Sequence, residues 1–179
     1  MRRMVPDYIA SAAIAGRTSG EIEGVTVCVT IRSCNETVQE AISGNSNDAS
    51  TVSRRVDQLW SEPVSLVRSH GGVVVGFRGD TMTAFFPSET VSIRRVWDTI
   101  VSILANPSPS GDTGTASIGL SGGSLAWTVA GPPHHRNFAF YGSPLVRARD
   151  AMNRTGDGTI CFEVSEADVL NELGITYPE

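Results

Sequence analysis

Residues 70–87, HGGVVVGFRGDTMTAFFP, decide the fold. Two apolar runs flank a short polar turn made of Arg78, Gly79 and Asp80, and this pattern predicts a β-hairpin over 73–86. A Gly-Asp pair at the tip of a hairpin is a usual place to hold a metal ion over a phosphate. Asp80 is equally typical of tight turns, where the carboxylate bonds its own backbone. The residues alone leave both interpretations of Asp80 open.

Outward from this hairpin, the apolar spacing predicts an alternation of strands and helices. We expect a buried strand over 23–32, and a helix over 51–70 that Pro63 bends or splits. A further helix follows the N-cap Ser88. The other expected elements are a helix over 35–44, two strands around 121–123, a strand over 137–142, a helix over 146–152, a strand over 158–162 and a helix over 164–173. This order predicts an α+β fold with a ferredoxin-like βαββαβ core and extra helix and strands.

Composition narrows the class of protein. The chain has 179 residues, 40% of them hydrophobic, which is enough for one core. A net charge of -5 argues against a nucleic-acid partner, because such proteins carry clustered basic surfaces. No apolar run approaches the length of a membrane span, so we expect no direct membrane insertion. The three cysteines, Cys28, Cys34 and Cys161, form no zinc or disulfide pattern, and a reducing, cytoplasmic compartment is therefore expected.

The basic residues have an unusual composition. All 14 are arginine, and the chain contains no lysine. A phosphate-binding P-loop needs a lysine, and so does Schiff-base chemistry. The sequence excludes both.

Three separated motifs resemble the class III nucleotide cyclase domain. VTVCVTIRSCNE (25–36) resembles its first strand and turn, and residues 70–87 resemble its metal-bearing hairpin. ASIGLSGGSLAWTVAGPPHHRNFAFYGSPLVRARDAM (116–152) resembles the run through its dimer-facing strands and nucleotide helix. Within this family, the sequence is most similar to one half of a soluble, bicarbonate-regulated adenylyl cyclase. The resemblance implies a lead-in segment over 1–20 and a single cyclase-homology domain over 21–179.

The resemblance also implies a chemistry, for which this chain lacks most of the residues. In the family's reaction the ribose 3′-hydroxyl attacks the α-phosphate and pyrophosphate leaves. Two Mg²⁺ or Mn²⁺ ions assist this step, and two carboxylates hold them. The hairpin carboxylate matches Asp80, a residual metal ligand, but the first-strand carboxylate falls on Thr30. The base-reading lysine falls on Gly76, and its acidic companion falls on Ala139. The transition-state asparagine falls on Val146, and the transition-state arginine falls on Asp150.

Two smaller sites complete the expected set. The turn Arg32-Ser33-Cys34 is expected to aim backbone N–H groups at phosphates, as helix starts do. Arg149, with Arg147 beside it, matches an arginine of the bicarbonate pocket in the soluble branch. An exposed helix arginine with a solvated head is the alternative interpretation.

These assignments predict a catalytically degenerate cyclase-like domain. Its expected role is dimerisation with another cyclase-type domain, as a homodimer or heterodimer, for regulation or scaffolding in cyclic nucleotide signalling. The expected cofactors are Mg²⁺ or Mn²⁺ with a nucleoside triphosphate, or none. The alternative is an active half of a heterodimeric adenylate cyclase that converts ATP to cyclic AMP and pyrophosphate. In that half Thr30 alone would count against catalysis.

Overall fold

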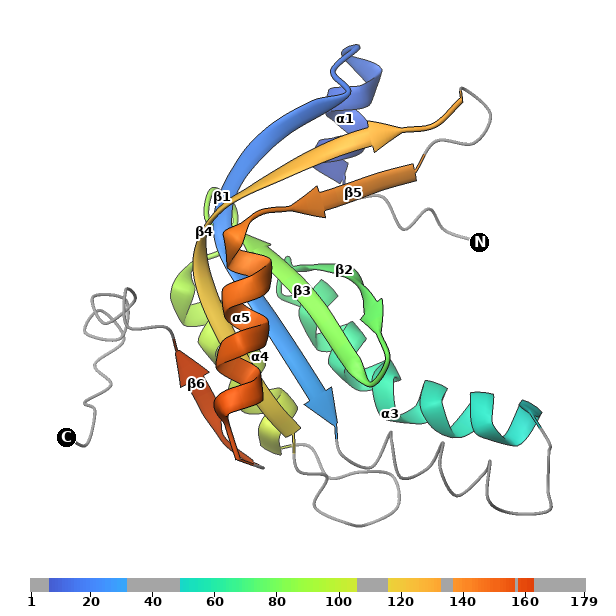
Figure 1. Ribbon diagram of the computed structural model, residues 1–179, viewed down its shortest axis with the longest axis vertical. Helices are drawn as coiled ribbons and strands as arrows, with labels where there is room; N and C mark the ends of the chain where they lie inside the picture. Colours follow the sequence, from blue (N-terminus) through green and yellow to red (C-terminus); the bar gives the residue numbers. More distant parts are fainter. Residues whose placement is uncertain (1–6, 32–48, 106–115, 133–136, 157, 163–179) are drawn as a thin grey trace.

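A computed structural model describes residues 7–31, 49–105, 116–132, 137–156 and 158–162 (Figure 1). Within these ranges the helices are α1 (Asp7–Ile14), α3 (Ala49–Ser69), α4 (Ile93–Ala105) and α5 (Ser143–Arg154). The strands are β1 (Ser19–Ile31), β2 (Val73–Arg78), β3 (Thr81–Pro87), β4 (Ala116–Ala130), β5 (Asn137–Tyr141) and β6 (Ile160–Phe162). None of the described helices is long and apolar enough to cross a membrane.

One mixed sheet organises the chain. Its strands lie in the order β2-β3-β1-β4-β5, with β6 paired in parallel to β4. The pairs β2–β3, β3–β1 and β1–β4 are all antiparallel. Strands β1 and β2, joined through α3, therefore lie on either side of β3, which is the arrangement of a split βαβ unit. The expected α+β fold with a ferredoxin-like core is confirmed.

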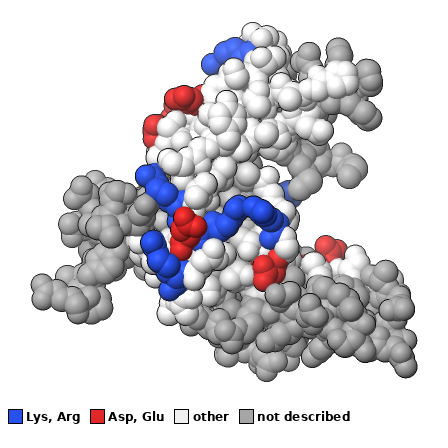
Figure 2. Space-filling model, in the orientation of Figure 1, with Lys and Arg blue, Asp and Glu red and all other residues white. Residues whose placement is uncertain are grey.

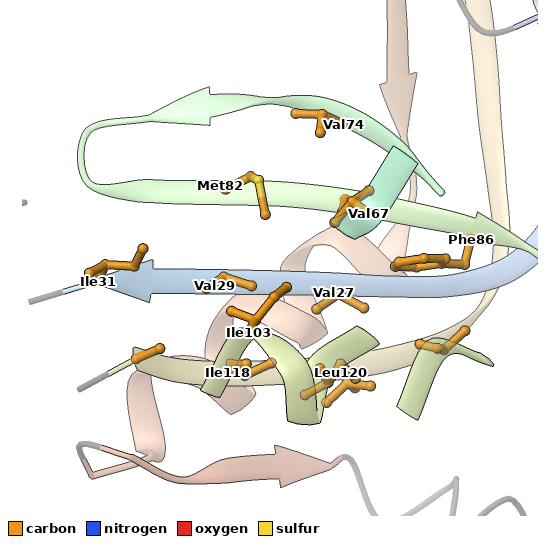
Figure 3. Close-up of a cluster of buried hydrophobic side chains, with 14 of the residues drawn as sticks. Val27, Val29, Ile31, Val67, Val74, Met82, Phe86, Ile103, Ile118 and Leu120 are labelled. Carbon is orange, nitrogen blue, oxygen red and sulfur yellow. The ribbon is translucent and has the colours of Figure 1, made fainter. Parts of the chain in front are cut away.

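The alternation of side chains along β1 separates two faces of the sheet. Val27, Val29 and Ile31 enter the main core, where they pack with residues of α3 and α4. Figure 3 shows these three side chains close to Met82 of β3 and Ile103 of α4. The intervening Cys28 lies on the opposite face and packs against Ala148 and Met152 of α5. Helices α3 and α4 thus cover one face, and α5 covers the other (Figure 1).

One expectation about element boundaries is corrected, and for Pro63 one of the two expected outcomes is found. Residues 116–130 form one continuous strand, not two strands around 121–123. The Gly122-Gly123 pair does not break the strand, because its pairing with Val25 and Gly24 of β1 continues through it. Pro63 lies inside α3 and does not split it; Figure 1 shows a change of direction along this helix.

The other expected elements within the described residues are present, some with shifted ends. Strand β1 starts at Ser19, so the expected division after residue 20 falls inside a strand. The hairpin, the helix after Ser88 and the late strand at 160–162 are confirmed. The helices expected over 35–44 and 164–173 lie outside the described residues. The assignment of 21–179 as a single domain stays a prediction.

Candidate functional site

The candidate metal site lies where the end of β1 meets the β2–β3 turn. Thr30 is opposite Thr81 on β3, and Thr81 is opposite Arg78 on β2. Between these last two residues the chain turns through Gly79 and Asp80 alone. Gly79 has a φ of 62°, a conformation that favours glycine and that type I′ and II′ hairpin turns require at their first central position. The register therefore brings Thr30 and Asp80 together, as the resemblance implies.

Two threonine hydroxyls donate hydrogen bonds to Asp80 at this turn. The Thr30 hydroxyl donates to the backbone carbonyl of Asp80 at 3.2 Å. The Thr81 hydroxyl donates to the Asp80 carboxylate oxygen Oδ1 at 3.4 Å. Asp80 is half-buried and Thr81 is buried. The carboxylate thus accepts a hydrogen bond from its neighbour's side chain, not the bond to its own backbone that the turn interpretation expects, and that interpretation stays a prediction.

The donor set does not fit a pair of divalent cations. Asp80 brings one negative charge, and Thr30 brings a neutral hydroxyl whose proton is already directed at a carbonyl. No group of three His, Cys, Asp or Glu side chains that could hold a metal occurs among the described residues. Mg²⁺ and Mn²⁺ prefer carboxylate and carbonyl oxygens, and two such ions carry four positive charges. No reaction step is therefore assigned to metal ions at this corner.

The other four family positions are spread over β2, β5 and α5. Gly76 is on β2, at an irregularity in the β2–β3 register, and Ala139 is on β5. Three strands separate β2 from β5 in the sheet. Val146 and Asp150 lie one turn apart on α5, and both are exposed. Within one chain the two base-reading positions, Gly76 and Ala139, are therefore not brought together.

The two arginines of the expected regulatory pocket do not converge. Arg147 donates from Nη2 to the carbonyl of Gly122 at 2.7 Å and from Nε to the hydroxyl of Ser121 at 3.1 Å. Arg149 is two residues further along the helix and so points in a different direction. Its positive charge acts on Cys28 and lowers the pKa of that thiol, although burial raises that pKa by more.

Charged side chains gather on α5, which carries Arg147, Arg149, Asp150 and Arg154. Figure 2 shows blue and red atoms across the middle of this face, over that helix. The turn 32–34, expected to bind phosphates, lies outside the described residues.

A row of small polar side chains under α5 was not predicted. Thr26, Thr30, Thr83 and Ser121 share the sheet face of Cys28. Cys28 Sγ and the Thr83 hydroxyl lie 3.6 Å apart, and the Thr26 hydroxyl is buried without a hydrogen-bond partner in the described part of the chain. The alternation of Thr and Cys with valine over 26–30 could have identified this face, because residues two apart in a strand share a side.

The comparison with solved structures identifies the architecture. The adenylyl cyclase CyaB from P. aeruginosa matches with a TM-score of 0.69 and 12% identity, over 88% of this chain and 84% of that one. The dimeric guanylyl cyclase domain of RhoGC from the fungus Blastocladiella emersonii matches with a TM-score of 0.68 and 19% identity, over 87% and 88%. The chain has the fold of a class III nucleotide cyclase domain.

A third cyclase structure holds a nucleotide. The guanylate cyclase domain of RhGC from Catenaria anguillulae, in complex with GTP, matches with a TM-score of 0.66 and 18% identity, over 84% of each chain. No protein-family model and no curated protein sequence matches the chain. The cyclase fold is therefore retained at a low level of sequence identity.

Proposed function

We propose that this cyclase-like domain is catalytically degenerate and acts as a dimerising regulatory or scaffolding partner in cyclic nucleotide signalling. The observation that carries the proposal is the hydrogen bond from Thr30 to the Asp80 carbonyl. At the position where the family holds a metal-binding carboxylate, this chain has a neutral group that serves the hairpin turn.

Charge is the reason that this replacement matters. Cyclisation of a nucleoside triphosphate depends on stabilising the negative charge that moves onto the phosphates, and metal ions supply much of that stabilisation. One carboxylate offsets too little charge to hold two cations. Val146 and Asp150 add an apolar group and a negative charge where the family has an asparagine and an arginine.

A partner domain follows from the layout of the positions. Gly76 and Ala139 lie on strands near opposite edges of the sheet, so a groove lined by both would need a second domain. One of the neighbouring cyclase structures is a non-canonical dimer, and a monomeric structure of the same domain also matches. The partner we propose is another cyclase-type domain, as a second copy or a related chain. Arg149 stays a candidate contact for a regulatory anion, whereas the hydrogen bonds of Arg147 favour a structural role.

Binding of Mn²⁺ with a non-hydrolysable ATP or GTP analogue, followed by titration calorimetry, tests the degenerate site. Thr30→Asp restores the missing charge, and Thr30→Asn is its neutral control of similar size. We expect weak or no Mn²⁺-dependent binding by the wild type and by Thr30→Asn, and at least about tenfold tighter binding by Thr30→Asp. Asp80→Ala should abolish any residual binding.

The outcome that supports the alternative function is also clear. If the wild-type domain binds two Mn²⁺ ions with nucleotide, or forms cyclic AMP when mixed with a cyclase domain that supplies the other groups, it is an active half of a heterodimer. Sedimentation equilibrium of the chain, alone and with such a domain, tests the proposed dimerisation separately. Monomers in both samples would contradict it.

A further inference from the structure

Helix α4 has two rows of apolar side chains. The first row is buried in the main core and consists of Val96, Ile100 and Ile103. Ile93, Trp97 and Val101 are four residues apart and form the second row, which we call the α4 stripe. Trp97 is half-buried, and Val101 is 43% exposed. The described residues therefore cover the α4 stripe only in part.

Strand β6 ends against this stripe. Among the described strands β6 pairs only with β4, so it lies at an edge of the sheet (Figure 1). The ring of Phe162, its last residue, stacks on the ring of Trp97, with centroids 5.7 Å apart and planes inclined by 24°. The chain that follows Phe162 therefore starts at the α4 stripe.

The segment after Phe162 is acidic. Residues 163–179 contain no arginine and five carboxylate side chains, those of Glu163, Glu166, Asp168, Glu172 and Glu179. The rest of the chain contains fourteen acidic side chains and all fourteen arginines, so the whole net charge of -5 belongs to this segment. The first turn of α4 carries Arg94 and Arg95, both exposed, and no acidic residue. Asp98 lies 3.9 Å from Arg94, but both side chains are exposed and such pairs are weak. The start of α4 and the segment thus have complementary charges.

The same segment has apolar residues at helical spacing. In the helix expected over 164–173, Ala167, Leu170 and Leu173 share one face because they are three residues apart. At a rise of about 1.5 Å per residue this face is about 9 Å long, and the α4 stripe is about 12 Å long. The apolar face of the segment is therefore short enough to lie along the stripe.

We propose that residues 164–173 dock as an amphipathic helix on the α4 stripe of the same chain. The apolar face covers Trp97 and Val101, and the carboxylates lie toward the first turn of α4. Because the segment is tethered at Phe162, its effective concentration at the stripe is on the order of millimolar, and a weak contact is enough to hold it. With the stripe occupied in this way, this side of α4 is not available to a partner domain.

Hydrogen exchange measured by mass spectrometry on the full chain, without nucleotide or metal, tests the docking. Val101→Asp places a charge in the α4 stripe, and Leu170→Asp places one in the apolar face of the segment. We expect either substitution to speed exchange in residues 164–173 by about tenfold relative to the wild type, with β1 and β3 unchanged.

Each substitution has a matched control. Ile14→Asp changes an apolar residue on α1 that is 89% exposed. Asn171→Asp changes a residue of the segment that lies off its apolar face. In both controls, residues 164–173 should exchange at the wild-type rate. Leu170→Asp leaves α4 unaltered, so it keeps the test decisive if Val101→Asp disturbs that helix.

Quenching of tryptophan fluorescence by acrylamide is the second readout. Trp60 and Trp127 are buried, so the quenching depends mainly on the half-buried Trp97. It should increase in Val101→Asp and Leu170→Asp and stay unchanged in the two controls.

Three results would overturn the proposal. Wild-type exchange in 164–173 as fast as in Leu170→Asp would mean that the segment is not docked. Exchange that Leu170→Asp speeds but Val101→Asp does not, with unchanged quenching of Trp97, would place the segment elsewhere. Exchange that becomes faster on dilution of the wild type would mean that the segment binds another copy. None of these results involves nucleotide or metal, so failure here is distinguishable from failure of the proposed function, on which the docking does not rest.

Discussion

The hydroxyl of Thr30 donates a hydrogen bond to the backbone carbonyl of Asp80 at 3.2 Å, from the end of β1 to the turn between β2 and β3. An ionised aspartate at position 30 has no proton to donate and could not make this bond. Support of the turn by a hydroxyl and metal binding by a carboxylate are therefore competing uses of the same position. In this chain the Thr30 hydroxyl makes the first use of it.

This bond should contribute measurably to stability. Thr30→Val keeps the shape of the side chain but leaves the Asp80 carbonyl without its donor. We expect a loss of about 1 kcal/mol in the free energy of unfolding, measured by urea denaturation. Thr30→Ser retains the hydroxyl and is the control, with a smaller expected loss. Equal losses in the two variants would show that the methyl group matters and the hydrogen bond does not.

The contact between β4 and α5 gives a second prediction. A Cβ atom on Gly119 would overlap the carbonyl oxygen of Ala148 and the backbone nitrogen of Met152. These are backbone atoms of a helix and cannot move away singly. Gly119→Ala should therefore cost about 3 kcal/mol or more of stability, at the upper end of overpacking effects.

Gly156 provides the matched control for that substitution. It is exposed, and apart from its chain neighbours no atom of the described residues lies within 4 Å of a Cβ placed there. Gly156→Ala should change the free energy of unfolding by less than about 1 kcal/mol in either direction. If Gly119→Ala proved as mild as Gly156→Ala, α5 would not pack on β4 as closely as described.

A buried hydroxyl on α1 gives a third prediction. The hydroxyl of Tyr8 is inaccessible to solvent and has no hydrogen-bond partner among the residues that the structure describes. Because an unpaired buried hydroxyl costs about 1–3 kcal/mol, Tyr8→Phe should raise the stability of the domain, seen as a higher midpoint of thermal unfolding. Tyr141→Phe, at a tyrosine that is 53% exposed, should leave the midpoint unchanged. A lower midpoint for Tyr8→Phe would mean that the hydroxyl has a partner in solution.

The sequence predicted the hairpin and its turn because local chemistry determines both. The apolar runs on each side of Gly79 and Asp80 pair with each other directly, so no distant residue decides their register. The continuity of β4 could not be predicted in the same way. Gly122 and Gly123 look like a break, and only their pairing with β1, about a hundred residues earlier, keeps them in the strand.

The candidate site was predictable in part for similar reasons. The proximity of Thr30 and Asp80 followed from the family resemblance and is confirmed. The separation of Arg147 from Arg149 follows from helix geometry, since residues two apart on a helix point in different directions. The partners of Arg147 on β4 could not be predicted, because they depend on how closely α5 approaches that strand.

We expect the buried thiol of Cys28 to make the free energy of unfolding depend on pH in the alkaline range. Burial raises the pKa of this thiol above its ordinary value of 9.0, while the Thr83 hydroxyl and the Arg149 charge oppose the shift. As pH rises past about 9 the unfolded chain loses the thiol proton first, and the folded chain keeps it. The stabilising effect is therefore complete below pH 9 and is lost as pH rises toward the folded-state pKa.

Urea denaturation at pH 7 to 10 tests this dependence, and all proteins compared carry Tyr8→Phe, because the pKa of Tyr8 is also raised. The free energy of unfolding should fall more steeply with pH in the protein that has Cys28 than in the protein that also carries Cys28→Ala. The difference in slope is at most about 1.4 kcal/mol per pH unit for one proton. Parallel curves would show that the folded and unfolded thiols titrate alike, and that Cys28 is not buried beneath α5 in solution.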